Sequence, residues 1–221
     1  MKTIKFKAII FDLDGTLLDT LKDLANSMNA VLSCHEMKTF RIDDYRYFVG
    51  KGLGELIRSV LPRDRVSDQF VDEFLVEMRM EYAKRWAENT RPYPGIPDLL
   101  DKLQRIGLPL AVLSNKADEF TQIIIKTLLS KWQFEVIRGL KDDLPPKPDP
   151  ASALWIADQM KIQPSDFIYI GDTGIDMQTA NSAGMYSVGA LWGFRTAEEL
   201  KENGAKALIE TPLQLLDLLK I

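Results

Sequence analysis

The segment Ala8–Phe11 constrains the fold most, because it is a short apolar run that ends directly at two aspartates, Asp12 and Asp14. A run of this length, bounded by acids and then glycine, is typical of a buried β-strand. In an open α/β sheet, ligands bind in the crevice beyond the carboxyl ends of the strands. We therefore expect the chemistry of this chain to lie at the end of this strand.

The two aspartates are expected to face the same way. Side chains alternate along an extended chain, so Asp12 and Asp14 lie on one side and Leu13 on the other. Two carboxylates this close repel each other and raise a pKa unless a cation compensates. Oxygen ligands of this kind suit a hard divalent cation, above all Mg²⁺. The alternative is a solvated acidic turn, since aspartate and glycine are ordinary turn residues.

A long helical stretch follows the first strand. After Thr16, apolar residues recur every three or four positions, which predicts amphipathic helices over residues 17–32, 53–61 and 70–86. No convincing buried strand is found before residue 89. We therefore predict a helical domain at residues 17–89, inserted into a core formed by residues 1–16 and 90–221.

Predicted helices and strands alternate in the second part of the chain. Paired prolines and a glycine at Pro92–Gly95 mark the return from the helical stretch. Strands are predicted at residues 108–113, 134–137, 167–170, 186–190 and 207–209, and helices at residues 98–105, 120–129, 152–160, 175–183 and 213–219. This alternation predicts an α/β fold with a parallel sheet and right-handed crossovers.

Composition excludes several classes of function. The net charge is −4, from 28 basic and 32 acidic residues, which leaves no basic footprint for nucleic acid. No apolar stretch approaches the roughly 20 residues needed to span a bilayer. Residues 1–7 are basic but lead into a strand too short for the apolar part of a signal peptide. The single cysteine, Cys34, excludes an internal disulfide and fits a reducing compartment, so we expect a cytoplasmic protein.

Further polar groups follow other predicted elements. Ser114 and Asn115 follow the second core strand and offer a hydroxyl and backbone N–H groups to an anion, although they could equally cap a helix. Asp172 and Asp176 follow a later strand, and four acids converging at one sheet edge would be costly without a cation. Lys147 stands among prolines, so a fixed charge explains it better than the solvated lysine that is the usual alternative.

In this order, the polar segments resemble the motifs of the haloacid dehalogenase superfamily of phosphohydrolases. They are Asp12-Leu13-Asp14-Gly15-Thr16, Ser114, Lys147 and Gly171-Asp172-Thr173-Gly174-Ile175-Asp176. Any one motif is weak alone, but all four occur in order and after the expected elements. The resemblance covers the whole chain and implies a Rossmann-like, doubly wound parallel sheet with an inserted helical cap.

The resemblance also implies roles for the acids. Asp12 would attack phosphorus and become an aspartyl phosphate, while Asp14 would act as general acid and then general base. Mg²⁺ would be held by Asp12, by the backbone carbonyl of Asp14 and by Asp172, with Asp176 in or just behind that shell. Neutralising the charges in this way brings a phosphate dianion up to a carboxylate nucleophile.

The same resemblance assigns residues to the substrate. Ser114, the N–H group of Asn115 and Lys147 would hold the phosphoryl oxygens. We also expect Gly15 and Thr16, which complete the first motif, to lie against the substrate.

Within the superfamily, the closer resemblance is to phosphoglycolate phosphatases. It rests on less specific segments, among them Leu113-Ser114-Asn115-Lys116 and the glycine-rich loop Phe48-Val49-Gly50-Lys51-Gly52. A mobile loop over residues 46–54 would bring Arg46 and Lys51 to a carboxylate at the far end of the substrate. The alternative for both cations is plain solvation. Arg195, in one of the last loops, is a further candidate to reach the site.

Several functions are left open by these residues. The leading hypothesis is a Mg²⁺-dependent phosphatase of a small phosphorylated metabolite, with 2-phosphoglycolate as the expected substrate. A β-phosphoglucomutase-like hexose-phosphate mutase would use the same aspartates. A regulatory module that binds a phosphometabolite without turnover is the alternative from another class. We expect no nucleic-acid or membrane partner, and the sequence does not distinguish a monomer from a homodimer.

Overall fold

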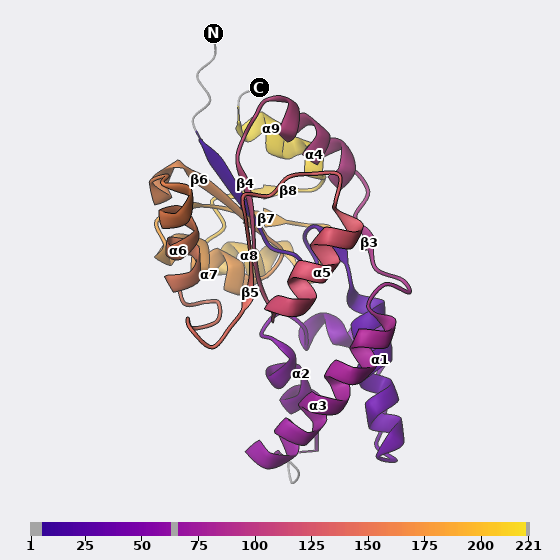
Figure 1. The fold of residues 1–221 in the computed structure, drawn as a ribbon. Helices are drawn as coiled ribbons and strands as arrows, with labels where there is room; N and C mark the ends of the chain where they lie inside the picture. The colour runs from indigo at the N-terminus through magenta and orange to yellow at the C-terminus, as the bar shows by residue number, and fades with distance from the viewer. Residues whose placement is uncertain (1–5, 63–65, 220–221) are drawn as a thin grey trace.

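The computed structural model describes residues 6–62 and 66–219, and its centre is a six-stranded parallel sheet (Figure 1). The strands, in spatial order, are β5 (Val136–Leu140), β4 (Leu110–Ala117), β1 (Ala8–Phe11), β6 (Phe167–Gly171), β7 (Tyr186–Ala190) and β8 (Ala207–Ile209). The predicted Rossmann-like α/β fold is confirmed. Because β1 lies between β4 and β6, the ends of three strands meet where the first aspartates stand.

Helices cover both faces of the sheet, and each face has its own core. Ile10 of β1 packs on one face, whereas Ile9 and Phe11 pack on the other. The first face is covered by α6 (Ala151–Met160) and α7 (Gly174–Ser182), and the second by α4 (Ile96–Arg105), α5 (Asp118–Leu128) and α9 (Leu215–Leu218). The short helix α8 (Ala197–Glu202) follows β7. Burial on both faces explains why the predicted strands are apolar runs without alternation.

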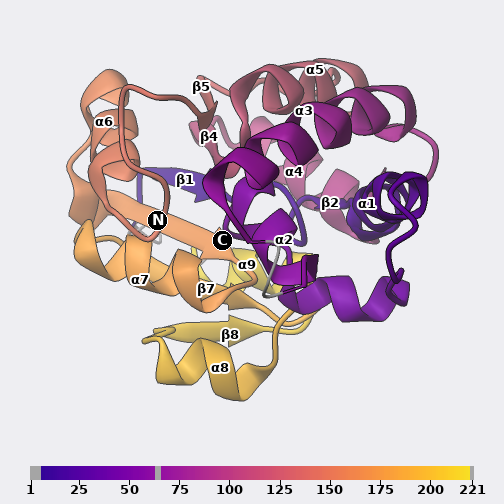
Figure 2. The same cartoon turned by 90° about the horizontal axis from the view of Figure 1, so that it is seen from below.

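Helices also fill the chain between the two short strands that follow β1 and precede α4. They are α1 (Leu21–Cys34), the 3-10 helix η1 (Ile42–Tyr47), α2 (Leu53–Val60) and α3 (Asp68–Arg85). We call residues 20–90 the helical segment. In Figure 1 these helices are grouped below the sheet, and Figure 2 views the molecule from their side. On α3, Phe74, Met78 and Tyr82 are buried, as the apolar row at four-residue spacing predicts.

The two ends of the helical segment lie side by side. Two short strands, β2 (Leu18–Asp19) and β3 (Arg91–Pro92), pair antiparallel where the chain enters and leaves it. Nearby, the buried carboxylate of Asp23 accepts hydrogen bonds from backbone and side-chain groups of Asn89 and Thr90, at 2.7–3.0 Å. The beginning of α1 is therefore fastened to the residues that precede β3.

Two predicted element boundaries, at the start of α1 and at the end of β4, need correction. The helix predicted from residue 17 begins at Leu21, because Leu18 and Asp19 are extended and pair with β3. The stretch expected to hold no buried strand thus contains one short strand, β2, in which Leu18 is buried and Asp19 is exposed. The strand predicted to end at residue 113 continues to Ala117. The polar residues that seemed to end it are buried within the strand, so polarity there marks a site and not a strand end.

Smaller differences concern later elements. The strand expected at residues 134–137 lies at Val136–Leu140. The closing helix expected at residues 213–219 is divided into η4 (Pro212–Gln214) and α9, and Pro212 stands at the first position of η4, where a missing N–H costs nothing.

Three other expectations stand as follows. No helix of the described residues is long and apolar enough to cross a bilayer. Residues 1–5, which carry most of the basic N-terminal stretch, lie outside the described residues. The division into a core and an inserted domain at residues 17–89 stays a prediction.

Candidate active site

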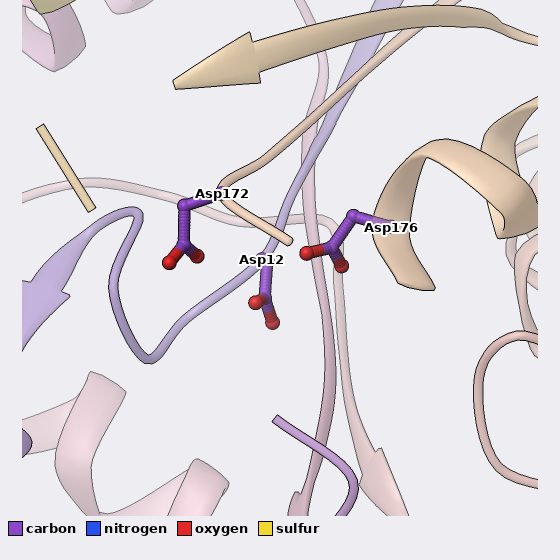
Figure 3. Close-up of side chains that lie close together, drawn as sticks. All are labelled: Asp12, Asp172 and Asp176. Carbon is purple, nitrogen blue, oxygen red and sulfur yellow. The ribbon is translucent and has the colours of Figure 1, made fainter. Parts of the chain in front are cut away.

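Three aspartates meet at the carboxyl end of the sheet. Asp12 follows β1, Asp172 follows β6, and Asp176 stands in the first turn of α7. Phe11 pairs with Ile170 in the sheet, so Asp12 and Asp172 leave adjacent strands side by side. Each offers a carboxylate oxygen to a group whose members lie within 4.8 Å of one another (Figure 3). All three side chains are buried.

The protein environment is unfavourable for three bare carboxylates. Burial raises the pKa of Asp12 well above its usual range, and the charge of Asp176 adds to the rise against the opposing charge of Lys147. Burial and the charge of Asp176 raise the pKa of Asp172 to about 7, although hydrogen bonds from Phe194 and Thr16 lower it. Desolvated, mutually repelling oxygens of this kind suit a small hard cation. The donor set therefore fits Mg²⁺.

Lys147 supplies a positive charge to this group. Its Nζ lies 2.8 Å from Asp12 Oδ1 and 2.7 Å from Asp176 Oδ1. Asn115 holds the lysine in place, because its side chain accepts from the Lys147 N–H at 2.8 Å and donates to the Lys147 carbonyl at 3.0 Å. The sequence reasoning expected a fixed charge here, and Lys147 is indeed fixed, although by Asn115 as well as by its prolines.

The loop after β6 is shaped by its own hydrogen bonds. Thr173 caps α7, and its N–H and hydroxyl both donate to Asp176 Oδ2, at 3.1 Å and 2.6 Å. This reciprocal cap directs the other oxygen of Asp176 toward Lys147.

Gly15 and Thr16 lie behind Asp172. The Thr16 hydroxyl donates to Asp172 Oδ1 at 3.0 Å. Gly15 has a φ of +89°, and a Cβ there would overlap the Asp172 carboxylate. Neither residue lines the cavity described below. The structure thus gives both a place in supporting a carboxylate, and their contact with a substrate stays a prediction.

Asp14 stands apart from the three buried aspartates. Its carboxylate is not part of their group but is paired with Lys116, whose Nζ lies 2.9 Å from each carboxylate oxygen. Of the four acids expected to converge at this sheet edge, Asp12, Asp172 and Asp176 form one group, and Asp14 borders the same cavity as Asp12 without joining that group. The physical reason is that a second lysine neutralises it separately.

Sequence reasoning assigned no role to Lys116, and a signal for it was present. Lys116 is two residues after Ser114 on an extended strand, so alternation places both side chains on the same side. A lysine inside an otherwise buried strand needs a partner, since a buried charge without one is costly.

A small cavity joins these groups to the helical segment. From the core, its walls include Asp12, Asp14, Ser114, Asn115, Lys116 and Lys147, and from the helical segment they include Leu24, Val49, Gly50, Gly52, Leu53 and Leu56. The space open to the centres of water molecules is about 30 Å³. Since one water-sized sphere takes roughly 10–15 Å³ by this measure, the cavity is narrow. One end is charged and the other is apolar.

The cationic candidates outside the core motifs do not line this cavity. Arg46 donates from Nη1 to the Gly193 carbonyl at 2.9 Å, and Lys51 is exposed. Arg195 donates from Nη2 to the Val49 carbonyl at 3.0 Å. Arg46 and Arg195 thus connect the loop of the helical segment to the loop after β7, one bond running in each direction.

Comparison with known proteins places these features in a family. A family model described as haloacid dehalogenase-like hydrolase matches residues 9–190. A phosphoglycolate phosphatase from Aquifex aeolicus is 32% identical over 188 residues, covering 85% of this chain and 86% of that protein. An N-acetylmuramic acid 6-phosphate phosphatase from Pseudomonas aeruginosa is 29% identical over 220 residues, covering 99% and 97%. A solved structure from Lactobacillus delbrueckii superposes with a TM-score of 0.89 at 29% identity, covering 97% of this chain and 98% of that one.

Proposed function

Since the chain belongs to the family of haloacid dehalogenase-like hydrolases, we propose that it is a Mg²⁺-dependent phosphatase that hydrolyses 2-phosphoglycolate to glycolate and phosphate. The observation that carries the proposal is the narrow cavity that Lys147, Asp12 and Asp14 line together. Relatives named phosphoglycolate phosphatase support the choice of substrate.

Asp12 and Asp14 divide the chemistry between them. A carboxylate oxygen of Asp12 forms a bond to phosphorus as the ester P–O bond breaks, and Asp14 gives a proton to the leaving oxygen. In the second step Asp14 takes a proton from water, the water oxygen bonds to phosphorus, and the bond to Asp12 breaks to release phosphate. Splitting one difficult substitution into two easier ones is the advantage of a covalent intermediate.

Three other groups orient the phosphoryl group. The Ser114 hydroxyl, the Asn115 N–H and the Lys147 ammonium donate to its oxygens. Lys147 already lies at hydrogen-bonding distance from Asp12, so a phosphoryl group bound by Lys147 would lie next to the nucleophile. Positioning and charge neutralisation account for most of catalysis in phosphoryl transfer.

The metal site is proposed at the buried aspartates. Asp12, Asp172, Asp176 and the backbone carbonyl of Asp14 would hold Mg²⁺, which when bound supplies positive charge that offsets the phosphate dianion. The raised pKa values of Asp12 and Asp172 support a cation there.

We further propose that residues 17–89 form a cap that excludes water and selects the substrate. The residues of the helical segment that line the cavity support this role. Arg46 and Lys51 are the proposed contacts for the substrate carboxylate. Lys51 stands between Gly50 and Gly52, two residues that border the cavity. The single cysteine supports a cytoplasmic location.

A phosphate-release assay tests the proposal. The panel contains 2-phosphoglycolate, N-acetylmuramic acid 6-phosphate, β-glucose 1-phosphate and p-nitrophenyl phosphate, each with Mg²⁺ or with excess EDTA. We expect the highest kcat/KM for 2-phosphoglycolate, no turnover in EDTA, and recovery on adding Mg²⁺. Release of phosphate in EDTA would contradict the metal requirement. Conversion of β-glucose 1-phosphate to glucose 6-phosphate without free phosphate would establish the mutase, and binding without turnover would establish the regulatory module.

A further inference from the structure

Lys116 is a buried lysine whose ammonium is paired with the candidate acid and base, Asp14. Its side chain is 4% exposed, and its Nζ lies 2.9 Å from both carboxylate oxygens of Asp14. Asp14 itself is 12% exposed on the side chain and borders the cavity. Because one ammonium contacts both oxygens, the end of the Asp14 side chain is held on the side of the cavity where Lys116 lies.

The helical segment holds the other side of Lys116. Its Nζ lies 4.7 Å from the centre of the Tyr82 ring, within the range of a cation–π contact. The Tyr82 ring is packed edge-on against Phe120 of α5, with centroids 5.1 Å apart. Lys116 is thus enclosed between Asp14 of the core and Tyr82 of α3.

Packing alone does not account for a tyrosine at this place. The Tyr82 hydroxyl is buried, and no hydrogen bond of ordinary geometry reaches it from the described residues, but it does interact with the ammonium of Lys116. Burying a hydroxyl without a full hydrogen bond is costly, so a phenylalanine would fill the space at lower cost if the hydroxyl had no role toward Lys116. The hydroxyl feels the charges of both Lys116 and Asp14, and burial raises the pKa of Tyr82 to about 12.

Stability also does not account for the ion pair. The attraction between two buried charges is largely offset by the loss of their hydration. What the pair does determine is the direction in which the Asp14 carboxylate points. Lys147 forms ion pairs with Asp12 and Asp176, whereas Lys116 forms an ion pair with Asp14. Each aspartate of the first motif is therefore paired with a different lysine, one in the loop before α6 and one in β4.

We propose that Lys116 is a positioning residue that aims the carboxylate of Asp14 at the leaving oxygen of the substrate, and that Tyr82 of α3 keeps Lys116 in place. The proposal rests on the phosphatase function proposed above. Lys116 transfers no proton and does not touch phosphorus. Its effect is confined to the steps in which Asp14 moves a proton, because Asp14 is the group that it holds. The effect can be as large as 10²-fold in rate, which is roughly the cost of displacing a reacting group by 1 Å.

The kinetic test compares two leaving groups in single turnover. Lys116→Met keeps the length of the side chain and removes the charge. We expect it to slow transfer from an alkyl ester that lacks a carboxylate, ethyl phosphate, by about 10²-fold, and transfer from p-nitrophenyl phosphate by less than about 5-fold. The KM for 2-phosphoglycolate should stay within about 2-fold, because a positioning role acts on kcat. Lys116→Arg should restore part of the ethyl phosphate rate.

Three outcomes decide between this role and others. If Lys116→Met slows both leaving groups equally, Lys116 is structural and the proposal fails. If it raises KM for 2-phosphoglycolate alone, Lys116 binds the substrate carboxylate and the proposal also fails. If it adds nothing to the loss already caused by Asp14→Asn, the two residues act as one unit, as proposed. Lys126→Met, on the exposed side of α5, is the matched control and should leave both rates unchanged.

A structural measurement separates this proposal from the proposed function. Failure of the function would appear as a wild type that releases no phosphate from any ester. Independently of turnover, a crystal structure of Lys116→Met should show the Asp14 carboxylate rotated away from its wild-type direction, and Tyr82→Leu should displace the Lys116 ammonium. An Asp14 carboxylate that keeps its direction without Lys116 would overturn the proposal.

Discussion

At the scale of single residues, Asp12 and Asp14 illustrate how two side chains in one motif come to have different surroundings. Asp12 is buried with Asp172, Asp176 and Lys147, whereas the one ion pair of Asp14 within the described part of the chain is with Lys116. A nucleophile needs to be held against phosphorus, and an acid needs to reach the leaving oxygen on the other side of the reaction centre. The division of neighbours supports the division of roles proposed above.

Replacing Asp12 tests the covalent step. Asp12→Asn keeps nearly the same shape but provides a poor nucleophile, so turnover should be lost while the fold is kept. Wild-type enzyme quenched during turnover with ³²P-labelled substrate should carry an acid-stable adduct that hydroxylamine removes, and the variant should carry none. Near-UV circular dichroism should be the same for both. A labelled serine in either protein would refute the assignment to Asp12.

The residues of the site show what a sequence can and cannot reveal. Asp12, Asp172 and Lys147 were predicted as one site, and the structure brings them together. Lys116 was missed, because a lysine next to a motif is usually solvated and nothing in the spacing reveals that α3 covers it. Placement of Lys51 could not be predicted either, since the direction of a side chain in a glycine-rich loop depends on tertiary contacts.

At the scale of elements, the junction of β5 and α5 links fold stability to pH. Asp118, the first residue of α5, accepts from the Gly139 N–H at 2.8 Å and pairs with Lys141 at 3.1 Å. Burial acts to raise the pKa of Asp118, but these contacts outweigh it and the pKa lies below the usual value. A lowered pKa contributes stability above the ordinary pKa of aspartate, and this stability is lost as pH falls through the folded value.

Asp118→Asn should therefore destabilise the protein at neutral pH and not in acid. We expect a loss of about 0.5–1 kcal/mol in the free energy of unfolding at pH 7, since the hydrogen bond is partly kept and the lysine is half exposed. Urea unfolding at pH 7, 5 and 3 measures the difference between the two proteins. The difference should narrow below about pH 4, where aspartate takes up its proton. A difference that is the same at all three values would contradict this account.

The loop of residues 46–54 tests where substrate recognition resides. Lys51→Ala should lower kcat/KM for 2-phosphoglycolate by about 1.5–3 kcal/mol, the scale of a hydrogen bond to a charged group. Activity on p-nitrophenyl phosphate, which has no carboxylate, should change little. Arg46→Ala should slow both substrates, because it also removes the bond to the Gly193 carbonyl. Equal losses for Lys51→Ala would assign that residue to closure of the loop.

Element boundaries were predicted less well than element order. Alternation of apolar runs and amphipathic stretches placed every core strand, because burial on both faces leaves a strong apolar pattern. The boundaries failed where a site interrupts that pattern, as in β4, whose last residues are polar and nevertheless buried. They failed also at β2, which exists only because β3 lies beside it.

At the scale of the whole molecule, the metal should couple the sheet to stability. A cation that binds the folded chain alone stabilises it by about 2.7 kcal/mol at a concentration 100 times its Kd. We expect Mg²⁺ to raise the Tm of the wild type, because it joins Asp12 after β1 to Asp172 after β6. Differential scanning fluorimetry with Mg²⁺ and with EDTA measures this shift.

Two variants make that measurement specific. Asp172→Asn should abolish the Mg²⁺-dependent rise in Tm, since it removes a proposed ligand. Asp158→Asn, an exposed carboxylate on α6, should leave the rise unchanged. An equal rise in all three proteins would mean that Mg²⁺ acts on the surface and not at the buried aspartates.

The pairing of β2 with β3 has a consequence for how such a molecule can change over evolution. The chain leaves the core at β2 and returns at β3, and these two strands are paired. For the core, the connection of some seventy residues between them therefore has its two ends as close together as those of a tight hairpin. Lengthening a connection whose ends already touch adds little closure entropy. A helical unit of different size or shape could therefore be inserted between β2 and β3 without a change in the reaction centre. New substrates would be acquired by replacing the helical segment, while the residues at the carboxyl end of the sheet stay unchanged.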